Sequence, residues 1–312
     1  MLDIRHIVKQ YSNHRALDDV SIYVPKGSIF GLLGPNGAGK TSLIRIINQI
    51  TAPDSGQIYF DGELLQPKHI ERIGYLPEER GLYKKMKIGE QMLYLAQLKG
   101  LGKQDAIHRI RYWFEKLHME DWFEKKVEDL SKGMQQKVQF VATVVHEPDL
   151  IILDEPFSGF DPVNAQTIQE EILELNKKGA TIIYSTHRME SVEELCDNIA
   201  LINKSRKILD GAVKEIKRSY QNQTYVIEFK KKADTAYALL DTALFELISE
   251  TDHAEESEIK IRIDATKSLN EILLYLIPQI DIHQIREIIP SMHDIFIDQV
   301  RKSSAPLATN HE

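Results

Sequence analysis

A short glycine-rich segment near the N-terminus has the residue pattern of a loop that joins a β-strand to an α-helix. Its residues, Gly34-Pro35-Asn36-Gly37-Ala38-Gly39-Lys40-Thr41, match GxxxxGK[ST]. The apolar run 29–33 before it predicts a strand, and the pattern over 40–49 predicts a helix. Glycines let successive backbone N–H groups turn toward phosphate oxygens, and the helix start adds positive charge. The segment therefore predicts a phosphate-binding loop, with Lys40 directed at the β- and γ-phosphates and the Thr41 hydroxyl at Mg²⁺.

The composition is that of a globular chain of ordinary size. Its 312 residues suggest two domains, with 42% hydrophobic and 28% charged residues. The longest unbroken apolar runs are short pieces such as 150–153, whereas a membrane-spanning helix needs roughly 20 mostly apolar residues. The N-terminus has no apolar stretch of signal-peptide length. A net charge of −8 argues against nucleic-acid binding through bulk electrostatics. The single cysteine, Cys196, excludes an internal disulfide and a multi-cysteine zinc site, so we expect a cytoplasmic protein.

Strand-like and helical patterns alternate along the first two-thirds of the chain. We predict strands at 2–8, 20–24, 28–33, 57–60, 150–153, 181–185 and 198–202, and helices near 163–177 and 189–196. This alternation favours an α/β fold with a mostly parallel sheet. The mainly helical block 88–146 is interpreted as an insertion into that fold.

A second unit is predicted after the polar segment 219–223. Alternating apolar residues indicate strands at 225–229 and 259–263, and helical patterns cover 234–244, 268–276 and 292–302. We interpret residues 223–302 as a small α+β domain and residues 303–312 as a frayed tail. The sequence contains no internal repeat and no second phosphate loop, so one chain supplies one nucleotide site.

The apolar strand at 150–153 ends in two carboxylates, Asp154 and Glu155. The carboxyl end of a buried parallel strand would bring Asp154 beside the phosphate loop, where it can hold Mg²⁺ directly or through water. Glu155 can polarise a water for in-line attack on a γ-phosphate. Alone, such a pair is more often two solvated acids at a strand end. The phosphate loop in the same chain favours the catalytic interpretation.

A third motif, Leu130-Ser131-Lys132-Gly133, stands 24 residues before Asp154. A phosphate loop, an LSxG element and an acidic strand in this order resemble the nucleotide-binding subunit of an ABC transporter, and the resemblance covers residues 1–219. Within it, Ser158-Gly159-Phe160-Asp161 resembles the D-loop of the family. His187 matches the switch histidine of the family, and Tyr11 matches the aromatic residue that stacks on adenine.

The resemblance implies the P-loop NTPase fold of an ABC cassette, with a mostly parallel sheet core, N-terminal antiparallel strands and a helical subdomain, followed by the small α+β domain. It implies ATP and Mg²⁺ as cofactors. The metal ligands would be Thr41, Glu78 and Asp154, and the catalytic residues Glu155 and His187. The implied ATP-binding residues are Tyr11, Gly34, Pro35, Asn36, Gly37, Ala38, Gly39, Lys40, Thr41, Ser42, Ser131, Gly133 and Asp161.

The resemblance also implies partners. Ser131 and Gly133 at a helix N-terminus would offer a hydroxyl and N–H groups to a γ-phosphate, and in this family that phosphate belongs to ATP held by the partner subunit. A head-to-tail homodimer, or a heterodimer with a paralogous ATPase subunit, is therefore expected. Since no segment of the sequence can span a bilayer, an integral membrane permease is expected as a separate chain, with this chain peripheral at the inner face of the cell membrane. No nucleic-acid partner is expected.

Two positions depart from the family pattern. Gln usually follows the strand near 73–76 and meets Mg²⁺ through its side-chain oxygen, whereas this chain has Glu78 after Pro77. A charged oxygen at Glu78 still permits metal binding. Lys132 and Met134 stand where the common signature has Gly and Gln, and a cation at Lys132 would favour the partner's ATP.

Two other functions fit parts of this pattern. A soluble non-transport ABC ATPase acting on a ribosome or nucleic-acid complex usually carries two cassettes or a long coiled-coil arm, and only 114 residues separate Lys40 from Asp154. A degenerate cassette that binds ATP without hydrolysis is disfavoured because Glu155 and His187 are both present. The main hypothesis is the ATPase subunit of an exporter-type transporter. Residues 223–302 resemble the accessory domain of some exporter-type subunits, and the sequence specifies neither its role nor the transported substrate.

Overall fold

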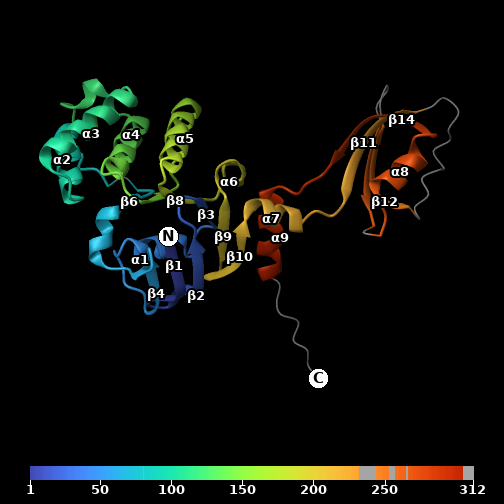
Figure 1. Cartoon of the computed structure of the whole chain (residues 1–312), viewed down its shortest axis with the longest axis horizontal. Coiled ribbons are helices and arrows are strands. Elements are labelled where there is room, and N and C mark those ends of the chain that lie inside the picture. Colours follow the sequence, from blue (N-terminus) through green and yellow to red (C-terminus); the bar gives the residue numbers. More distant parts are fainter. Residues whose placement is uncertain (80, 232–243, 253–256, 265, 305–312) are drawn as a thin grey trace. The chain divides into compact units, whose positions relative to one another are not determined.

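The computed structural model describes residues 1–79, 81–231, 244–252, 257–264 and 266–304 (Figure 1). Contacts divide the chain into two compact units, the first formed by residues 1–213 with the C-terminal residues from 299, and the second by residues 214–298. This division falls at the start of α7 (Val213–Ser219), whereas the sequence analysis placed the boundary after that helix. Each unit has its own sheet and hydrophobic core.

A six-stranded sheet forms the centre of the first unit. Its strands lie in the order β10-β9-β3-β8-β7-β6; neighbours from β9 to β6 are parallel, and β10 pairs antiparallel with β9. The strands are β3 (Ile29–Leu33), β6 (Ile73–Leu76), β7 (Leu150–Asp154), β8 (Thr181–Thr186), β9 (Asn198–Asn203) and β10 (Arg206–Ala212). Strands β3 and β7 are buried along their whole length, as continuous apolar runs require in a sheet covered on both faces. The predicted mostly parallel core is confirmed.

A four-stranded antiparallel sheet, of order β2-β1-β4-β5, forms the other layer of this unit. Its strands are β1 (Leu2–Tyr11), β2 (His14–Val24), β4 (Ser55–Phe60) and β5 (Glu63–Leu64). One hydrophobic core joins this sheet to the central sheet and to α1 (Lys40–Ile47), through buried side chains such as Leu2, Val20, Leu32, Ile44 and Ile152. The helix that follows the phosphate loop is therefore anchored between the two sheets.

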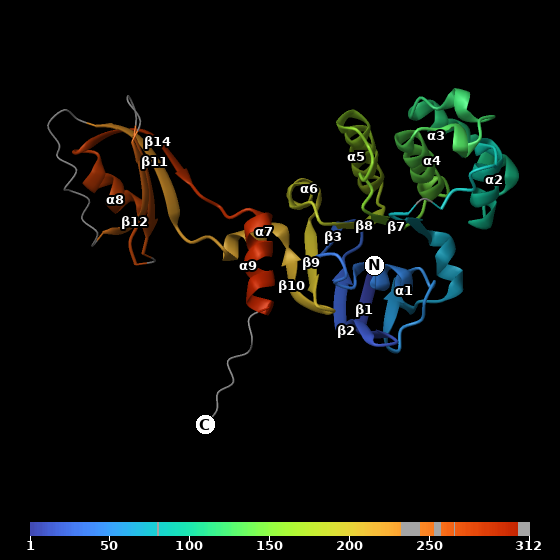
Figure 2. The same ribbon diagram turned by 180° about the vertical axis from the view of Figure 1, so that it is seen from behind.

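Three helices form the helical subdomain predicted at 88–146: α2 (Ile88–Leu98), α3 (Lys103–Lys116) and α4 (Lys132–Val144). Figure 2 shows them gathered together beyond the ends of the central strands. Buried Trp113 of α3 packs edge-on against Phe140 of α4, with 5.9 Å between the ring centroids. Two further helices, α5 (Pro162–Lys177) and α6 (Met189–Leu195), follow β7 and β8. Lys116 of α3 forms an ion pair with Glu174 of α5 at 2.6 Å, which links the subdomain to the helix after β7.

The second unit contains an antiparallel sheet of order β12-β13-β11-β14, against which the amphipathic helix α8 (Leu269–Leu276) packs. Its strands are β11 (Thr224–Lys231), β12 (Phe245–Asp252), β13 (Ser257–Ile263) and β14 (Ile280–Glu287). Ile272 and Leu276 of α8 enter a core with Phe229 and Ile261 of the sheet. The predicted α+β class is confirmed, although strands β12 and β14 were not predicted.

The last helix differs from the prediction at its C-terminal end. Helix α9 (Met292–Ser304) includes Ser303 and Ser304, which the sequence analysis assigned to a frayed tail. Asn203 of β9 donates a side-chain hydrogen bond to the Ser303 hydroxyl at 2.7 Å, which attaches this end of α9 to the first unit. Residues 305–312 of the predicted tail and residues 234–243 of the predicted helix lie outside the described residues.

Candidate functional site

The predicted phosphate loop connects the end of β3 to the start of α1. Gly34, Gly37 and Gly39 have φ angles of 150°, 78° and 115°, which residues with side chains rarely adopt. Space also excludes a side chain at two of them. A Cβ at Gly34 would lie 2.2 Å from the carbonyl oxygen of Ile202, and one at Gly39 would lie 2.3 Å from that of Ala16. The shape of the loop therefore depends on glycine at these positions.

The Lys40 side chain is buried and folds back over this loop. Its ammonium donates hydrogen bonds to the carbonyl oxygens of Gly34 at 2.6 Å and Pro35 at 3.3 Å. Burial lowers the pKa of Lys40, and the charges of Glu155, Asp154 and Glu78 oppose that shift. The surrounding carboxylates thus favour the charged amine that phosphate binding needs.

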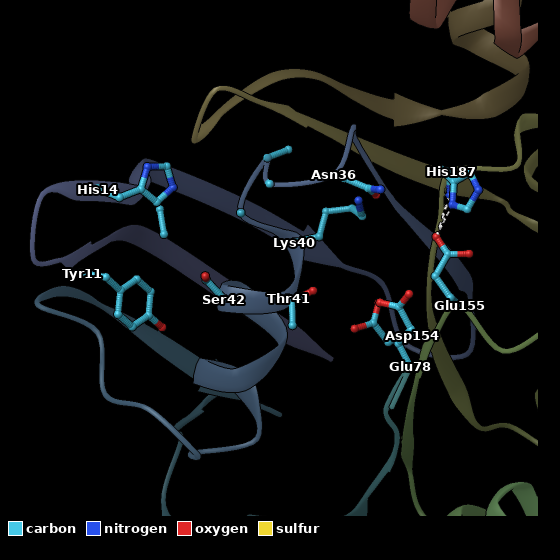
Figure 3. A pocket seen from close by; sticks show the side chains of 14 residues that line it. Tyr11, His14, Asn36, Lys40, Thr41, Ser42, Glu78, Asp154, Glu155 and His187 are labelled. Carbon is cyan, nitrogen blue, oxygen red and sulfur yellow. Dashed lines mark hydrogen bonds and ion pairs between the residues drawn. The ribbon is translucent and has the colours of Figure 1, made fainter. Parts of the chain in front are cut away.

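One cavity of about 320 Å³ brings most of the predicted residues together (Figure 3). The residues that line it are Tyr11, His14, Ala16, Asn36, Gly37, Ala38, Gly39, Lys40, Thr41, Ser42, Glu78, Asp154, Glu155 and His187. Gly34 and Pro35 do not line the cavity, but their carbonyl oxygens accept hydrogen bonds from Lys40, which does. The volume lies within the range of small-molecule sites.

Three carboxylates face the loop from the ends of two neighbouring strands. Asp154 is the last residue of β7, Glu155 follows it, and Glu78 stands just beyond β6, which pairs in parallel with β7. Figure 3 shows the carboxylates of Glu78 and Asp154 side by side. Burial raises the pKa of Asp154, and the charge of Glu78 raises it further. A cation placed between these two groups would relieve their repulsion.

Glu155 is held by the end of β8, the other neighbour of β7. Its backbone adopts a φ of 49°, and its N–H donates to the Ser185 carbonyl oxygen at 2.9 Å. Its carboxylate accepts hydrogen bonds from the Thr186 hydroxyl at 3.2 Å and from the His187 backbone N–H at 3.0 Å. His187 Nδ1 lies 2.6 Å from Glu155 Oε1 (Figure 3). Glu155 is therefore fixed in orientation, while the His187 side chain is 60% exposed.

The donor set fits Mg²⁺. Thr41 offers a hydroxyl, and Asp154 and Glu78 offer carboxylates, in the same cavity as the phosphate loop. Mg²⁺ commonly takes one or two protein carboxylates and completes its octahedron with water and substrate phosphates. Among the described residues, no group of three or more His, Cys, Asp or Glu side chains is arranged to hold a metal without such help.

The far end of the cavity is formed by the β1–β2 hairpin. Tyr11 and His14 are paired across its turn, and the Tyr11 ring is partly exposed. The Lys9 ammonium lies 5.4 Å from the centre of that ring. Sequence reasoning found Tyr11 and missed His14 and Ala16. The available signal was the turn-favouring pair Ser12-Asn13, because a tight turn there returns the chain directly past Tyr11.

The signature residues lie in a second hollow of about 380 Å³. It is lined by Trp122, Ser131, Gly133, Met134, Lys137, Gly159, Asp161 and Asn164, none of which lines the first cavity. Ser131 caps α4, its hydroxyl accepting from the Met134 N–H at 3.3 Å, and Asp161 caps α5, accepting from the Asn164 N–H at 3.0 Å. Within one chain, the structure therefore does not bring Ser131, Gly133 or Asp161 to Lys40.

A glycine-rich loop that faces an acidic strand end, with an LSxG helix start on a separate helical subdomain, defines a P-loop nucleotide-binding cassette. Comparison with known families agrees: the ABC transporter family matches residues 17–158. A second family, described as the C-terminal domain of DrrA1-3-like ATP-binding proteins, matches residues 211–300.

Relatives cover the chain at greater length. It is 40% identical to the uncharacterized ABC transporter ATP-binding protein YhaQ of Bacillus subtilis. The alignment spans 300 residues and covers 96% of this chain and 98% of that protein. It is 33% identical over 219 residues to the Nod factor export ATP-binding protein I of Cupriavidus metallidurans, 69% of this chain and 72% of that one. The chain belongs to the ABC transporter ATP-binding proteins.

A solved ATP-binding subunit of an ABC transporter has the same fold. It is 30% identical, and the superposition covers 70% of this chain and 93% of that one with a TM-score of 0.66. The main hypothesis from sequence is therefore confirmed: this chain is an ATP-binding, ATP-hydrolysing subunit of an ABC transporter and not a non-transport ATPase. In the described part of the chain, no helix combines the length and the apolar character that crossing a bilayer demands.

Proposed function

We propose that this chain powers export through a separate membrane permease, as one half of a homodimer that closes around two ATP molecules. The observation that carries the proposal is the single cavity in which the phosphate loop faces Asp154, Glu155 and His187. Similarity to a protein named for Nod factor export supports the direction of transport. Association with the permease would place the chain at the inner face of the membrane.

The cavity residues bind different parts of ATP. Tyr11 stacks on adenine, while the backbone N–H groups of residues 36–42, at the start of α1, surround the phosphates. The Lys40 ammonium donates two of its three hydrogen bonds to carbonyl oxygens of the loop, so a phosphate oxygen can accept the third hydrogen bond. Thr41, Asp154 and Glu78 would hold Mg²⁺, which neutralises charge on the β- and γ-phosphates.

Glu155 acts as the general base. Its carboxylate accepts a proton from the attacking water, whose oxygen bonds to the γ-phosphorus as the bond to ADP breaks. The hydrogen bonds from Thr186 and His187 orient this carboxylate before the reaction. Because Nδ1–H of His187 donates to Glu155, its Nε2 is directed away; a hydrogen bond from Nε2 to the γ-phosphate requires that both ring nitrogens carry a proton.

The second hollow binds the ATP of the partner subunit. Ser131 caps α4 and Gly133 lies in its first turn; the positive end and N–H groups of this 13-residue helix favour phosphate. Asp161 lines the same hollow and would contact the partner across the interface. The separation of this hollow from Lys40 supports a head-to-tail dimer, because each complete site then takes one half from each chain.

Residues 78–79 and 81–87 form the proposed permease-binding surface. The segment begins at Glu78, which also lines the ATP cavity. Its residues Glu78, Glu79, Leu82 and Lys84 line one side of a hollow of about 810 Å³, and Val127 and Lys132 are among the other residues that line it. Tyr83 is 58% exposed and offers an aromatic contact of the kind that interfaces use. A segment shared by the cavity and this surface would couple ATP to the permease.

The test begins with the genes adjacent to that of this chain: a polytopic membrane protein encoded there is the candidate permease, and the chain is co-expressed with it. We expect the chain to co-purify with the membrane fraction only when that permease is present. Tyr83→Ala should weaken this association, while ATP affinity of the isolated chain stays unchanged. Membrane association that is independent of any permease, or a Tyr83→Ala chain that associates normally, would count against the proposed surface.

A further inference from the structure

Side chains on one face of α4 form hydrogen bonds with the two segments that carry Glu78 and Glu155. Gln136, Gln139 and Thr143 recur at helical spacing and are all buried. Gln136 donates to the Pro156 carbonyl oxygen at 3.3 Å, directly after Glu155. The Thr143 hydroxyl lies 2.9 Å from the Gln139 carbonyl oxygen of the same helix and 3.3 Å from the Tyr75 carbonyl oxygen. Figure 1 shows α4 extending from the helical subdomain to the level of β6.

Gln139 makes the most unusual of these contacts. Its amide nitrogen is shared between the carbonyl oxygens of Pro77 at 3.3 Å and Glu79 at 3.4 Å, the residues on either side of Glu78. Strand β6 ends at Leu76, so this segment lies beyond the sheet hydrogen bonds. Tyr75, by contrast, is inside β6 and is paired with Ile152.

The position of Gln139 would ordinarily favour an apolar side chain. Its neighbours Val138, Phe140 and Val141 are buried and apolar, and Gln139 itself is 4% exposed. Its side-chain oxygen has no hydrogen-bond partner among the described residues. A buried amide oxygen without a partner destabilises the fold, so packing alone does not account for this residue. The side-chain amide instead provides hydrogen bonds to the backbone on both sides of Glu78.

We propose that Gln139 is a positioning residue that fixes Glu78 relative to α4. By holding the carbonyls on both sides of Glu78, it sets where the Glu78 carboxylate lies beside Asp154. Ser131 caps the same helix eight residues earlier, about 12 Å along a rigid axis. A displacement of Glu78 by bound nucleotide is thereby conveyed to the phosphate-binding start of α4. This inference rests on the proposed role of Glu78 in binding Mg²⁺.

The test compares ATP affinity with and without Mg²⁺ by calorimetry, in a Glu155→Gln background that blocks turnover. Gln139→Met keeps the length and apolar bulk of the side chain but removes its hydrogen bonds. We expect it to lower the enhancement of ATP affinity by Mg²⁺ about two- to tenfold, the range for one lost hydrogen bond. Affinity in EDTA should be unchanged, which a general loss of structure would not allow.

Two further variants make the result specific. Thr143→Val removes the hydroxyl contacts with the Gln139 carbonyl, which belongs to the helix backbone, and with the Tyr75 carbonyl, which the sheet already fixes. Neither contact involves the Gln139 side-chain amide, so we expect no change in the Mg²⁺ enhancement. Glu78→Ala should lower the enhancement, and adding Gln139→Met to it should lower it no further. If Gln139→Met does not fold, Gln139→Asn, which is one methylene shorter, takes its place.

The outcomes separate the two proposals. An unchanged enhancement in Glu78→Ala would overturn the proposed metal role of Glu78, and the inference about Gln139 with it. If Glu78→Ala lowers the enhancement while Gln139→Met leaves it unchanged, or if the two effects simply add, only the inference is overturned.

Discussion

Glu155→Gln should abolish hydrolysis while leaving ATP binding and the fold intact. The amide can keep the contacts of the carboxylate, since its oxygen can still accept from the His187 N–H and its nitrogen can donate to the Thr186 hydroxyl. What it loses is the capacity to take a proton from the attacking water. Removing a general base lowers turnover about 10²- to 10⁴-fold, equivalent to about 3 to 5 kcal/mol of transition-state stabilisation.

Phosphate release under saturating ATP measures turnover, and calorimetry measures nucleotide affinity. We expect kcat to fall by that factor, the dissociation constant for ATP to change by less than about threefold, and Tm to shift by only a few degrees. The ATP-bound dimer should then persist and appear as a larger species in light scattering.

His187→Ala is the matched control, because it removes a neighbour of Glu155 but leaves the carboxylate itself. Its turnover should lie between that of wild type and that of Glu155→Gln. A Glu155→Gln chain that hydrolyses ATP within about threefold of the wild-type rate would refute the reasoning and transfer the role of base to another group. A chain that no longer binds ATP would show instead that the carboxylate has a structural role.

Two other predictions concern the composite site and acid stability. Gly133→Asp and Lys40→Ala chains should each fail to form an ATP-bound dimer. A mixture of the two should recover dimer, because one site then joins an intact phosphate loop of one chain to an intact LSxG element of the other. No recovery at any ratio would exclude a head-to-tail dimer. Burial and the nearby charge of Lys99 lower the pKa of His146 to about 4, so as pH falls from 6.5 the unfolded chain gains a proton that the folded chain does not. Between pH 6.5 and 4 this difference should lower the free energy of unfolding of the wild type by about 3 kcal/mol, a loss that His146→Leu should not show. Urea denaturation at the two pH values measures it. Equal losses in the two proteins would show that His146 is not buried in its neutral form.

The sequence allowed prediction of features whose chemistry is contiguous. The phosphate loop needs glycine at particular φ angles and a lysine at the start of the next helix, and these requirements fall within eight adjacent residues. The parallel core was predictable for a similar reason, because strands buried on both faces leave unbroken apolar runs such as 150–153. In both cases the local sequence carries the whole physical requirement.

Contacts that depend on which strands become neighbours were not predictable in this way. Glu155 and His187 are 32 residues apart, and their 2.6 Å contact exists because β7 and β8 are adjacent and end at the same level. The contact of Gln139 with Pro77 and Glu79 spans about 60 residues and depends on how α4 packs beside β6. No periodicity in the sequence encodes such distances.

The second unit shows a different limit. Strands β12 and β14 lie at the two edges of its sheet, and most of their residues are exposed. A solvent-facing edge strand needs few apolar residues, so its alternation is weak against the charged background. The central strand β13 alternates regularly between buried and more exposed residues and was predicted, because it is paired on both sides and contributes Ile259, Ile261 and Ile263 to the core.

The charges of the cavity explain why Glu78 need not impair nucleotide binding. Three carboxylates, Glu78, Asp154 and Glu155, surround one buried ammonium, and the raised pKa of Asp154 shows that burial and neighbouring charge already disfavour its ionised form. A polyanionic triphosphate entering alone would add to this repulsion. A divalent cation shared by the phosphates, Thr41 and the acids would remove it on both sides. A charged Glu78 where the family usually has a neutral Gln should therefore make the site more dependent on Mg²⁺, not less able to bind it.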